Sequence, residues 1–308
     1  MCQMKMLHEY LLAGIGVIFA AVMVVVHPAP HNVNGKIAFV HREKDIQQIY
    51  LMDSDGTHRT KLSDEYWDSW PVWSPDGTKI AFKRKPTKDS ATDLYVMNAD
   101  GHDAKLLAHD VEFQDPPAWS PDGSKLAFAS WHERDHSCTS CWSSIHVVNV
   151  DGTHEVQLTG VQFFRNPTWS PDGKKIAFVN NGALLVMNAD GSDQVELRKP
   201  NSALSASWSP DGREIMTWDY EPFNDDSGAE KMRPTIRAVS ALAVNSDGRL
   251  ISYGDDPAWS PDGAKVVFCR GTQIFVIDAS GAHATPLGDS FGADYRPAWG
   301  TAAQAAKN

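Results

Sequence analysis

Two kinds of segment in this sequence carry side chains that could do chemistry, and the first is the stretch 131–142. His132, His136, Cys138 and Cys141 offer two nitrogens and two thiolates, the donor set of a tetrahedral zinc site. Only one residue separates His136 from Cys138, which crowds the donors around a single metal. In an oxidising compartment Cys138 and Cys141 would instead form a disulfide. The sequence favours this disulfide, with free thiols and the zinc site as the alternatives.

The second kind is a set of loops that mix aromatic residues with acids and arginine. Aromatic and arginine side chains are typical anchors of protein–protein binding. The loops read DEYWDSWP (64–71), HDVEFQDPP (109–117), VQFFRNP (161–167), PNSALSAS (200–207), YGDDP (253–257) and DSFGADYRP (289–297). The candidate partner-binding residues are Trp67, Asp68, Asp115, Phe163, Phe164, Arg165, Asp255, Tyr295 and Arg296. In the alternative interpretation, the aromatic side chains only fill gaps between the loops.

Sequence signatures of enzymes are missing. We find no G-x-S-x-G elbow, Walker loop, H-E-x-x-H helix or dinucleotide-binding fingerprint. We therefore assign no catalytic residue and expect no cofactor. Carboxylates such as Asp68, Asp115, Asp255 and Asp256 could still pair for acid–base chemistry, so catalysis remains the alternative to binding.

The element that must position these loops is a repeat. The string WSPDG begins at Trp73, Trp119, Trp169, Trp208 and Trp259, and a truncated copy begins at Trp299. The spacing of 39 to 51 residues is that of a four-stranded propeller blade. Ser-Pro-Asp-Gly predicts a tight turn, because proline presets φ and glycine accepts a positive φ. Short apolar runs such as KIAF follow each turn, and a second Asp-Gly turn comes later in each unit.

The repeated WSPDGxKIAF followed by YVMNADG resembles the PD40 repeat of the TolB-type β-propeller family. The resemblance covers about residues 35–300 and implies an all-β, six-bladed propeller of four-stranded antiparallel blades. A strand at the C-terminus, ending at Trp299-Gly300, should complete the blade begun by Lys36–Phe39. The repeated tryptophans should wedge between neighbouring blades.

The resemblance to the TolB family also implies a function. It suggests a non-catalytic, extracytoplasmic binding or scaffold module that recognises a protein or envelope ligand, such as an envelope lipoprotein or a peptide, at the channel mouth. The alternative is a propeller enzyme, a polysaccharide lyase or hydrolase, acting in the central channel. The acids in the loops favour a basic or amide-rich protein segment as the partner.

Both predicted turns lie at one end of the strands, so the variable loops lie at the other end, where binding residues concentrate. We expect one residue from each loop to ring the mouth of the channel, namely Ser69, Asp115, Arg165, Leu204, Asp255 and Tyr295. The insertion from residue 219 to 234 is polar and punctuated by glycine and proline, which predicts a mobile, solvated loop, with a lid over the channel as the alternative.

The N-terminus contains sixteen uncharged apolar residues between Leu11 and Val26. As a helix they would be about 24 Å long, against a hydrocarbon core of about 30 Å. This stretch predicts a membrane anchor or, if it is cleaved, a secretion signal. The expected organisation is a cytoplasmic stub and hydrophobic segment (1–30), the propeller (31–300) and a disordered tail (301–308). The propeller would then be periplasmic or at the cell surface, anchored by residues 11–26 or secreted.

The net charge excludes one class of partner. Asp and Glu number 39 and Lys and Arg number 28, which makes the formal charge −11. An acidic surface repels the phosphate backbone, so we expect no nucleic-acid partner.

Overall fold

The computed structural model describes residues 34–301, with gaps at residues 45, 64–65, 88, 132–141, 199–202, 245–247 and 289–292. Every element in these residues is a β-strand. The hydrophobic stretch 11–26, the candidate zinc or disulfide residues and the tail 302–308 lie outside the described residues. Within the described part, no helix has the length and apolar character needed to cross a membrane.

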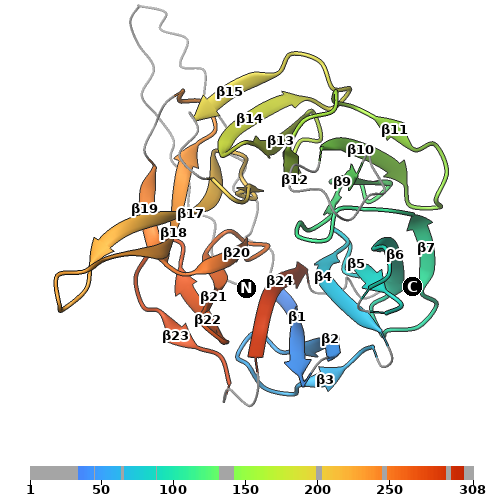
Figure 1. The fold of residues 1–308 in the computed structure, drawn as a ribbon. Helices are drawn as coiled ribbons and strands as arrows, with labels where there is room; N and C mark the ends of the chain where they lie inside the picture. Colours follow the sequence, from blue (N-terminus) through green and yellow to red (C-terminus); the bar gives the residue numbers. More distant parts are fainter. Residues whose placement is uncertain are drawn as a thin grey trace, which may run out of the picture. The chain divides into compact units, whose positions relative to one another are not determined.

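The strands form six four-stranded antiparallel sheets, the blades of a β-propeller, which confirms the fold expected from the repeat (Figure 1). Blade 1 contains β24 (Ala293–Thr301), β1 (Asn34–Glu43), β2 (Ile46–Met52) and β3 (Thr60–Lys61). Blade 2 contains β4 (Trp67–Trp73), β5 (Lys79–Lys85), β6 (Asp93–Asn98) and β7 (Lys105–Ala108). Blade 3 contains β8 (Ala118–Trp119), β9 (Lys125–Trp131), β10 (Ser143–Asn149) and β11 (Val156–Gln157).

The remaining three blades follow the same order along the chain. Blade 4 contains β12 (Phe164–Trp169), β13 (Lys175–Asn180), β14 (Ala183–Asn188) and β15 (Val195–Arg198). Blade 5 contains β16 (Ser207–Trp208), β17 (Glu214–Asn224), β18 (Glu230–Ser240) and β19 (Arg249–Tyr253). Blade 6 contains β20 (Asp255–Trp259), β21 (Lys265–Arg270), β22 (Gln273–Asp278) and β23 (Thr285–Pro286).

The Ser-Pro-Asp-Gly turn joins the first two strands of a blade through its own side chains. In blade 2, the Ser74 hydroxyl donates to the Asp76 carboxylate at 2.6 Å and accepts the Lys79 N–H at 2.9 Å. The Gly77 N–H donates to the Ser74 carbonyl at 2.9 Å, with φ at +70°, a conformation natural to glycine. The four later copies repeat these bonds, so the turn is encoded locally.

Each repeated tryptophan packs between two adjacent blades, as expected. Trp73 lies in an apolar cluster with Ala38 and Ile49 of blade 1 and with Ile80 and Phe82 of blade 2. The other five tryptophans each belong to a separate cluster drawn from two neighbouring blades, and they are Trp119, Trp169, Trp208, Trp259 and Trp299. A buried tryptophan removes on the order of 150–250 Å² from water, so these six seams hold the ring together.

The ring closes as predicted, by a C-terminal strand that joins the N-terminal blade. In the pairing of β24 with β1, Ala298 lies opposite Ala38. The Thr301 hydroxyl then donates to the Pro75 carbonyl of blade 2 at 2.9 Å. Gly300 lies against the Trp73 ring, where an added Cβ would stand 2.6 Å from the nearest ring atom.

The insertion between residues 219 and 234 is not the mobile loop that its composition predicted. It extends β17 and β18 into a continuous antiparallel hairpin that projects from blade 5 (Figure 1). At its base, Nη1 of Arg198 lies 3.3 Å from the buried Asp219 carboxylate. At its tip, Asp225 accepts the backbone N–H groups of Ser227 and Ala229 and pairs with Lys231 at 2.6 Å. These pairings order the hairpin, although its sequence contains glycine and proline.

Candidate binding site in the central funnel

A proline stands two residues before the repeated tryptophan in five of the six blades, and it shapes the innermost strand. Proline has no N–H for the ladder, so inside a strand it occurs at bulges. The register shifts at this point in β4, β12, β20 and β24. The residue before the proline takes a left-handed φ in these four blades, at Trp70 (+51°), Asn166 (+51°), Asp256 (+46°) and Arg296 (+55°).

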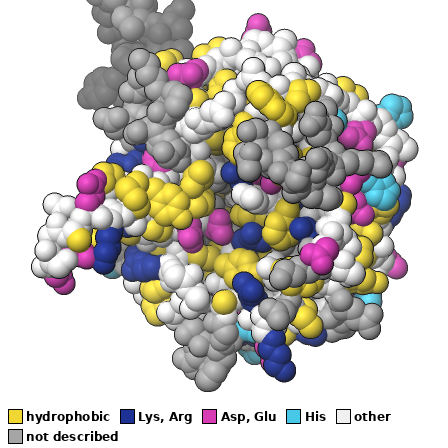
Figure 2. Space-filling model, viewed as in Figure 1, with side chains coloured by type: hydrophobic (Ala, Val, Ile, Leu, Met, Phe, Trp, Pro, Cys, Tyr) yellow, Lys and Arg dark blue, Asp and Glu magenta, His cyan; other side chains and the backbone are white. Residues whose placement is uncertain are grey.

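These positions line a central cavity of about 670 Å³, which we call the funnel. All six residues that lie three positions before a repeated tryptophan take part, and they are Trp70, Pro116, Asn166, Ser205, Asp256 and Arg296. Trp218 and Tyr220 add two aromatic walls from β17. Figure 2 shows acidic, basic and hydrophobic side chains side by side at the centre of this face.

The lining is offset by one residue from the predicted ring. Arg165, Leu204 and Asp255 do line the funnel. Ser69 and Asp115 are fully buried, and Tyr295 packs into the apolar cluster between blades 1 and 6. The bulge causes the offset, because one extra residue turns successive side chains of the strand. The x-Pro-x-Trp pattern is the sequence signal that could have identified Trp70, Asn166 and Asp256 as lining residues.

Arg165 and Asp115 join two blades at the rim of the funnel. Nη2 of Arg165 donates to Asp115 Oδ1 at 2.8 Å and Nε donates to the same oxygen at 3.1 Å. Asn166 Nδ2 donates to Asp115 Oδ1 at 2.8 Å and to the Leu204 carbonyl at 2.7 Å. Asp115 in the loop before blade 3 is therefore bound to β12 of blade 4, and Asn166 connects β12 to the loop before blade 5. Arg165 neutralises the charge of Asp115.

Two further charged groups, Lys83 and Glu112, are buried near Asp115. Lys83 of β5 is fully buried, and its ammonium donates to the backbone carbonyl of Glu112. Burial lowers the pKa of Lys83 to about 8 and raises the pKa of Glu112 to about 7, with Asp115 adding to the Glu112 shift. Each group is removed from water, and the attraction between their opposite charges offsets part of that loss. The bond from Lys83 to the Glu112 carbonyl holds the loop before blade 3 in place.

Three charged groups in the funnel wall are not neutralised in this way. Burial raises the pKa of Asp255 to about 6. Burial, and then the Asp255 carboxylate, raise the pKa of Asp256 to about 7, while Arg296 opposes the shift. The Arg296 guanidinium lies over the Trp70 ring, with Cζ 4.2 Å from the centroid, and its buried Nη1 has no hydrogen-bond partner among the described residues. These three groups can still form hydrogen bonds or ion pairs with a ligand.

The other predicted site residues are distributed over several environments. Asp68 is fully buried and paired with Arg84, whose Nε lies 2.8 Å from Asp68 Oδ1. Phe164 is buried in the apolar cluster between blades 3 and 4. Phe163 is 37% exposed beside Arg165, and Trp67 is half-buried. Of the nine predicted residues, Arg165, Asp255 and Arg296 line the funnel.

Asp255, Asp256 and Cys269 place one potential ligand atom each within 4.8 Å of one another. Burial raises the pKa of the Cys269 thiol well above its usual range, and the thiol has a backbone hydrogen bond from Arg296. A metal needs the thiolate, and the nearby guanidinium repels a cation, so we assign no metal to this cluster.

A comparison with the sequence patterns of known protein families identifies the family of this chain. The pattern of the TolB beta propeller domain (PD40) matches residues 16–183, more than half of the chain. The chain belongs to the TolB beta propeller domain family. A comparison with curated protein sequences finds no match.

Solved structures share the fold of this TolB-family propeller at low sequence identity. TolB from Acinetobacter baumannii has a TM-score of 0.68 and 20% identity, over 86% of this chain and 66% of that chain. Hydrazine synthase from Kuenenia stuttgartiensis has a TM-score of 0.68 and 15% identity, over 87% and 47%. Oligogalacturonate lyase from Vibrio parahaemolyticus has a TM-score of 0.54 and 14% identity, over 82% and 74%. The chain thus spans just under two thirds of TolB and about half of the hydrazine synthase.

Proposed function

We propose that this propeller is a non-catalytic binding module that receives a segment of a partner protein in its funnel. The observation that carries the proposal is the funnel itself. It has room for several side chains, aromatic walls at Trp70 and Trp218, and charges of both signs at Asp256 and Arg296. Aromatic and arginine anchors inside a concave, preformed site are typical of protein recognition.

The lack of symmetry in the lining supports a polypeptide ligand. The six equivalent positions of a repeat protein carry six different side chains: tryptophan, proline, asparagine, serine, aspartate and arginine. A symmetric ligand or a central ion would be served by identical side chains. An asymmetric segment with its own order of apolar and charged groups fits this wall.

The cellular setting belongs to the same proposal. The hydrophobic stretch 11–26 and the TolB-family propeller together favour a place outside the cytoplasm, with the stretch acting as an anchor or as a secretion signal. An envelope lipoprotein or another envelope protein is the partner that this setting offers.

Selection of random linear peptides on phage against the purified full-length protein tests the proposal. Enriched peptides, made synthetically, should bind the wild type and lose about tenfold in affinity with Trp70→Ala or with Asp256→Asn. The control Glu196→Gln removes an exposed carboxylate on the outer strand β15 and should leave binding unchanged. If no peptide depends on the funnel residues, the binding function is wrong.

Catalysis is the second candidate, and the adjacent Asp255 and Asp256 are the observation that favours it. Their raised pKa values, about 6 and about 7, suit an acid–base pair near neutral pH. Oligosaccharides from acidic and neutral polysaccharides, incubated with the protein and analysed by mass spectrometry, test this candidate. Turnover that disappears in Asp256→Asn would favour a lyase or hydrolase over the binding module.

A further inference from the structure

The outer ends of β17 and β18 present an apolar surface. Strand pairing places Tyr220 opposite Pro234 and Pro222 opposite Met232. Opposite residues and alternate residues share one face of a hairpin, so these four side chains form what we call the apolar hairpin face. Tyr220 is 45% exposed and Met232 is 57% exposed. Large apolar side chains gathered in solvent are typical of an interaction surface.

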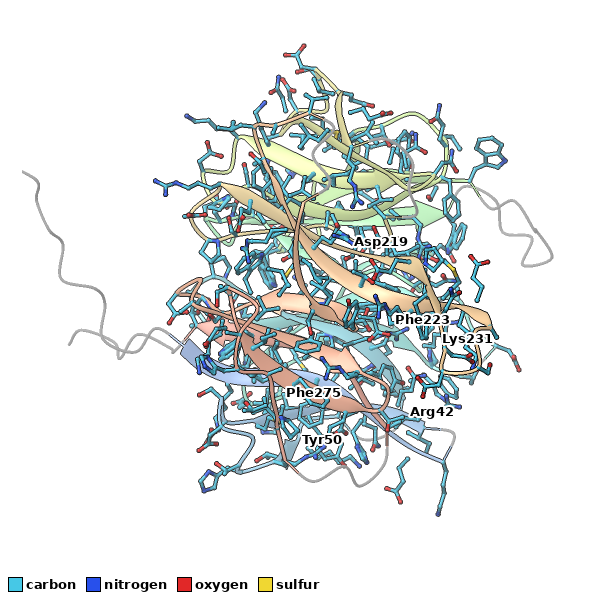
Figure 3. All side chains as sticks on the ribbon, turned by 90° about the vertical axis from the view of Figure 1, so that its left-hand side faces the viewer. Arg42, Tyr50, Asp219, Phe223, Lys231 and Phe275 are labelled. Atoms are coloured by element: carbon cyan, nitrogen blue, oxygen red, sulfur yellow. The ribbon has the colours of Figure 1, made fainter. Side chains whose placement is uncertain are left out.

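Contacts on the opposite face hold the hairpin rigid. The Arg233 guanidinium lies 3.8 Å from the Tyr253 ring centroid and 5.2 Å from that of Phe223. The Glu221 carboxylate accepts hydrogen bonds from Arg233 and from Arg237, both at 2.7 Å. Figure 3 shows Phe223 and Lys231 on the projecting part of the hairpin, with Asp219 nearer the body of the blade. A surface that is ordered in advance costs less entropy when a ligand binds.

The apolar hairpin face is continuous with the funnel. Tyr220 lines the funnel, and its ring packs edge-on against Trp218 with centroids 5.7 Å apart. The Pro234 carbonyl accepts the Gly254 N–H at 2.9 Å, so the hairpin adjoins the residue that precedes Asp255. Figure 2 shows hydrophobic side chains running from the hairpin to the acidic side chains near the centre. A ligand in the funnel can therefore extend onto the hairpin without crossing a polar gap.

The open edge of β17 does not favour pairing with a further strand. The Trp218 carbonyl accepts the Leu204 N–H at 2.9 Å, so Trp218 directs its backbone groups toward the funnel side. Alternate residues point the same way, which places Tyr220 and Pro222 on this edge. Because Pro222 has no N–H, an added strand would lack a donor there, a common protection of sheet edges. Recognition therefore depends on side chains.

We propose that the apolar hairpin face and the funnel form one docking surface for an extended segment of a partner protein. Apolar or proline side chains of the segment pack on the hairpin, and a lysine or arginine reaches Asp255 and Asp256. The proposal rests on the proposed binding function and extends it. It adds a second region of contact and the order of residue types in the partner.

The charges of the funnel wall favour a lysine or arginine in the partner segment. Asp255 and Asp256 form no ion pair within 4.0 Å among the described residues, and Arg296 is the one guanidinium whose attraction offsets the Asp256 shift. Arg165 is already neutralised by Asp115. Once the pH exceeds the Asp256 pKa of about 7, two carboxylates face the one Arg296 guanidinium, and this part of the funnel wall attracts a cation and repels an acidic segment.

Peptides selected against the full-length wild type as above test the docking surface. We expect enriched peptides to combine apolar or proline residues with a lysine or arginine. Met232→Ser should weaken their binding about five- to tenfold, while the matched control Val195→Ser, on an equally exposed outer strand, should not. Replacing the basic residue of the peptide by glutamine should weaken binding to the wild type more than binding to Asp256→Asn, which keeps only the Asp255 carboxylate. Circular dichroism confirms that each variant remains folded.

The outcomes separate the two proposals. Peptides that need Trp70 and Asp256 but ignore Met232 overturn the hairpin surface and leave the funnel function intact. Peptides whose glutamine versions bind the wild type equally well overturn the assignment of a basic residue. Peptides that ignore both the funnel and the hairpin overturn the proposed function as well.

Discussion

Arg296 of blade 1 lies over the indole ring of Trp70 of blade 2, with Cζ 4.2 Å from the ring centroid. The two residues occupy the same position in their repeats, both precede a proline, and both have a left-handed φ. Their contact joins the closing strand β24 to β4 of the next blade. It therefore belongs both to ring closure and to the funnel wall.

This contact should contribute measurably to stability. A cation–π pair that is partly removed from water is worth about 0.5–2 kcal/mol. A double-mutant cycle with Arg296→Met and Trp70→Leu, followed by urea unfolding, should give a coupling energy in this range. Strictly additive effects would mean that the contact does not stabilise the fold.

Asp256 should make stability fall as pH rises. Its pKa is about 7 in the folded protein and 3.8 without the fold, mainly because of burial. The folded state therefore holds the extra proton between about pH 4 and pH 7, and stability decreases through that window. Asp256→Asn should raise the melting temperature by a few degrees at about pH 8 and have no effect near pH 4.

Asparagine suits this test because it accepts the left-handed φ of position 256. Glu196→Gln, at an exposed site, is the matched control and should shift the melting temperature at neither pH. A gain of equal size at both pH values would show that the carboxylate charge is not its source.

Removal of residues 293–308 should open the ring. This deletion takes away β24 and Trp299, and truncating a buried tryptophan alone costs about 3–5 kcal/mol. We expect the melting midpoint to fall by about 10 °C or more. Deletion of residues 302–308 alone serves as the control and should leave the midpoint unchanged. An unaltered midpoint after the longer deletion would refute closure by β24.

Gly300 should tolerate no side chain. A Cβ there would stand 2.6 Å from the Trp73 ring, so Gly300→Ala must displace the indole from its cluster. Overpacking of this kind costs about 1–3 kcal/mol, measurable as a lower urea midpoint. Gly160→Ala is the control, because nothing lies within 4 Å of its Cβ position and its φ is not left-handed. Equal midpoints for the two variants would contradict the contact.

The sequence identified the loops that line the funnel but, in several blades, not the residue of the loop that faces it. The predicted ring took Ser69 and Asp115, which the structure buries, in place of Trp70 and Pro116, which line the funnel. Proline in a strand already indicated a bulge, and a bulge changes which side chain points inward. The ordered hairpin of β17 and β18 was not predicted, because it depends on pairs such as Arg198–Asp219 that are distant in sequence.

The sequence by itself determined the blade count, the turns and the strand that closes the ring. These features are local and repeated: a Ser-Pro-Asp-Gly turn satisfies its own hydrogen bonds, and the short apolar run that follows each turn predicts a strand. Only the tertiary structure decided what the funnel is made of. Charges such as Arg165 and Asp115 find each other across blades, fifty residues apart, and that pairing neutralises one arginine while Arg296 stays available for a ligand.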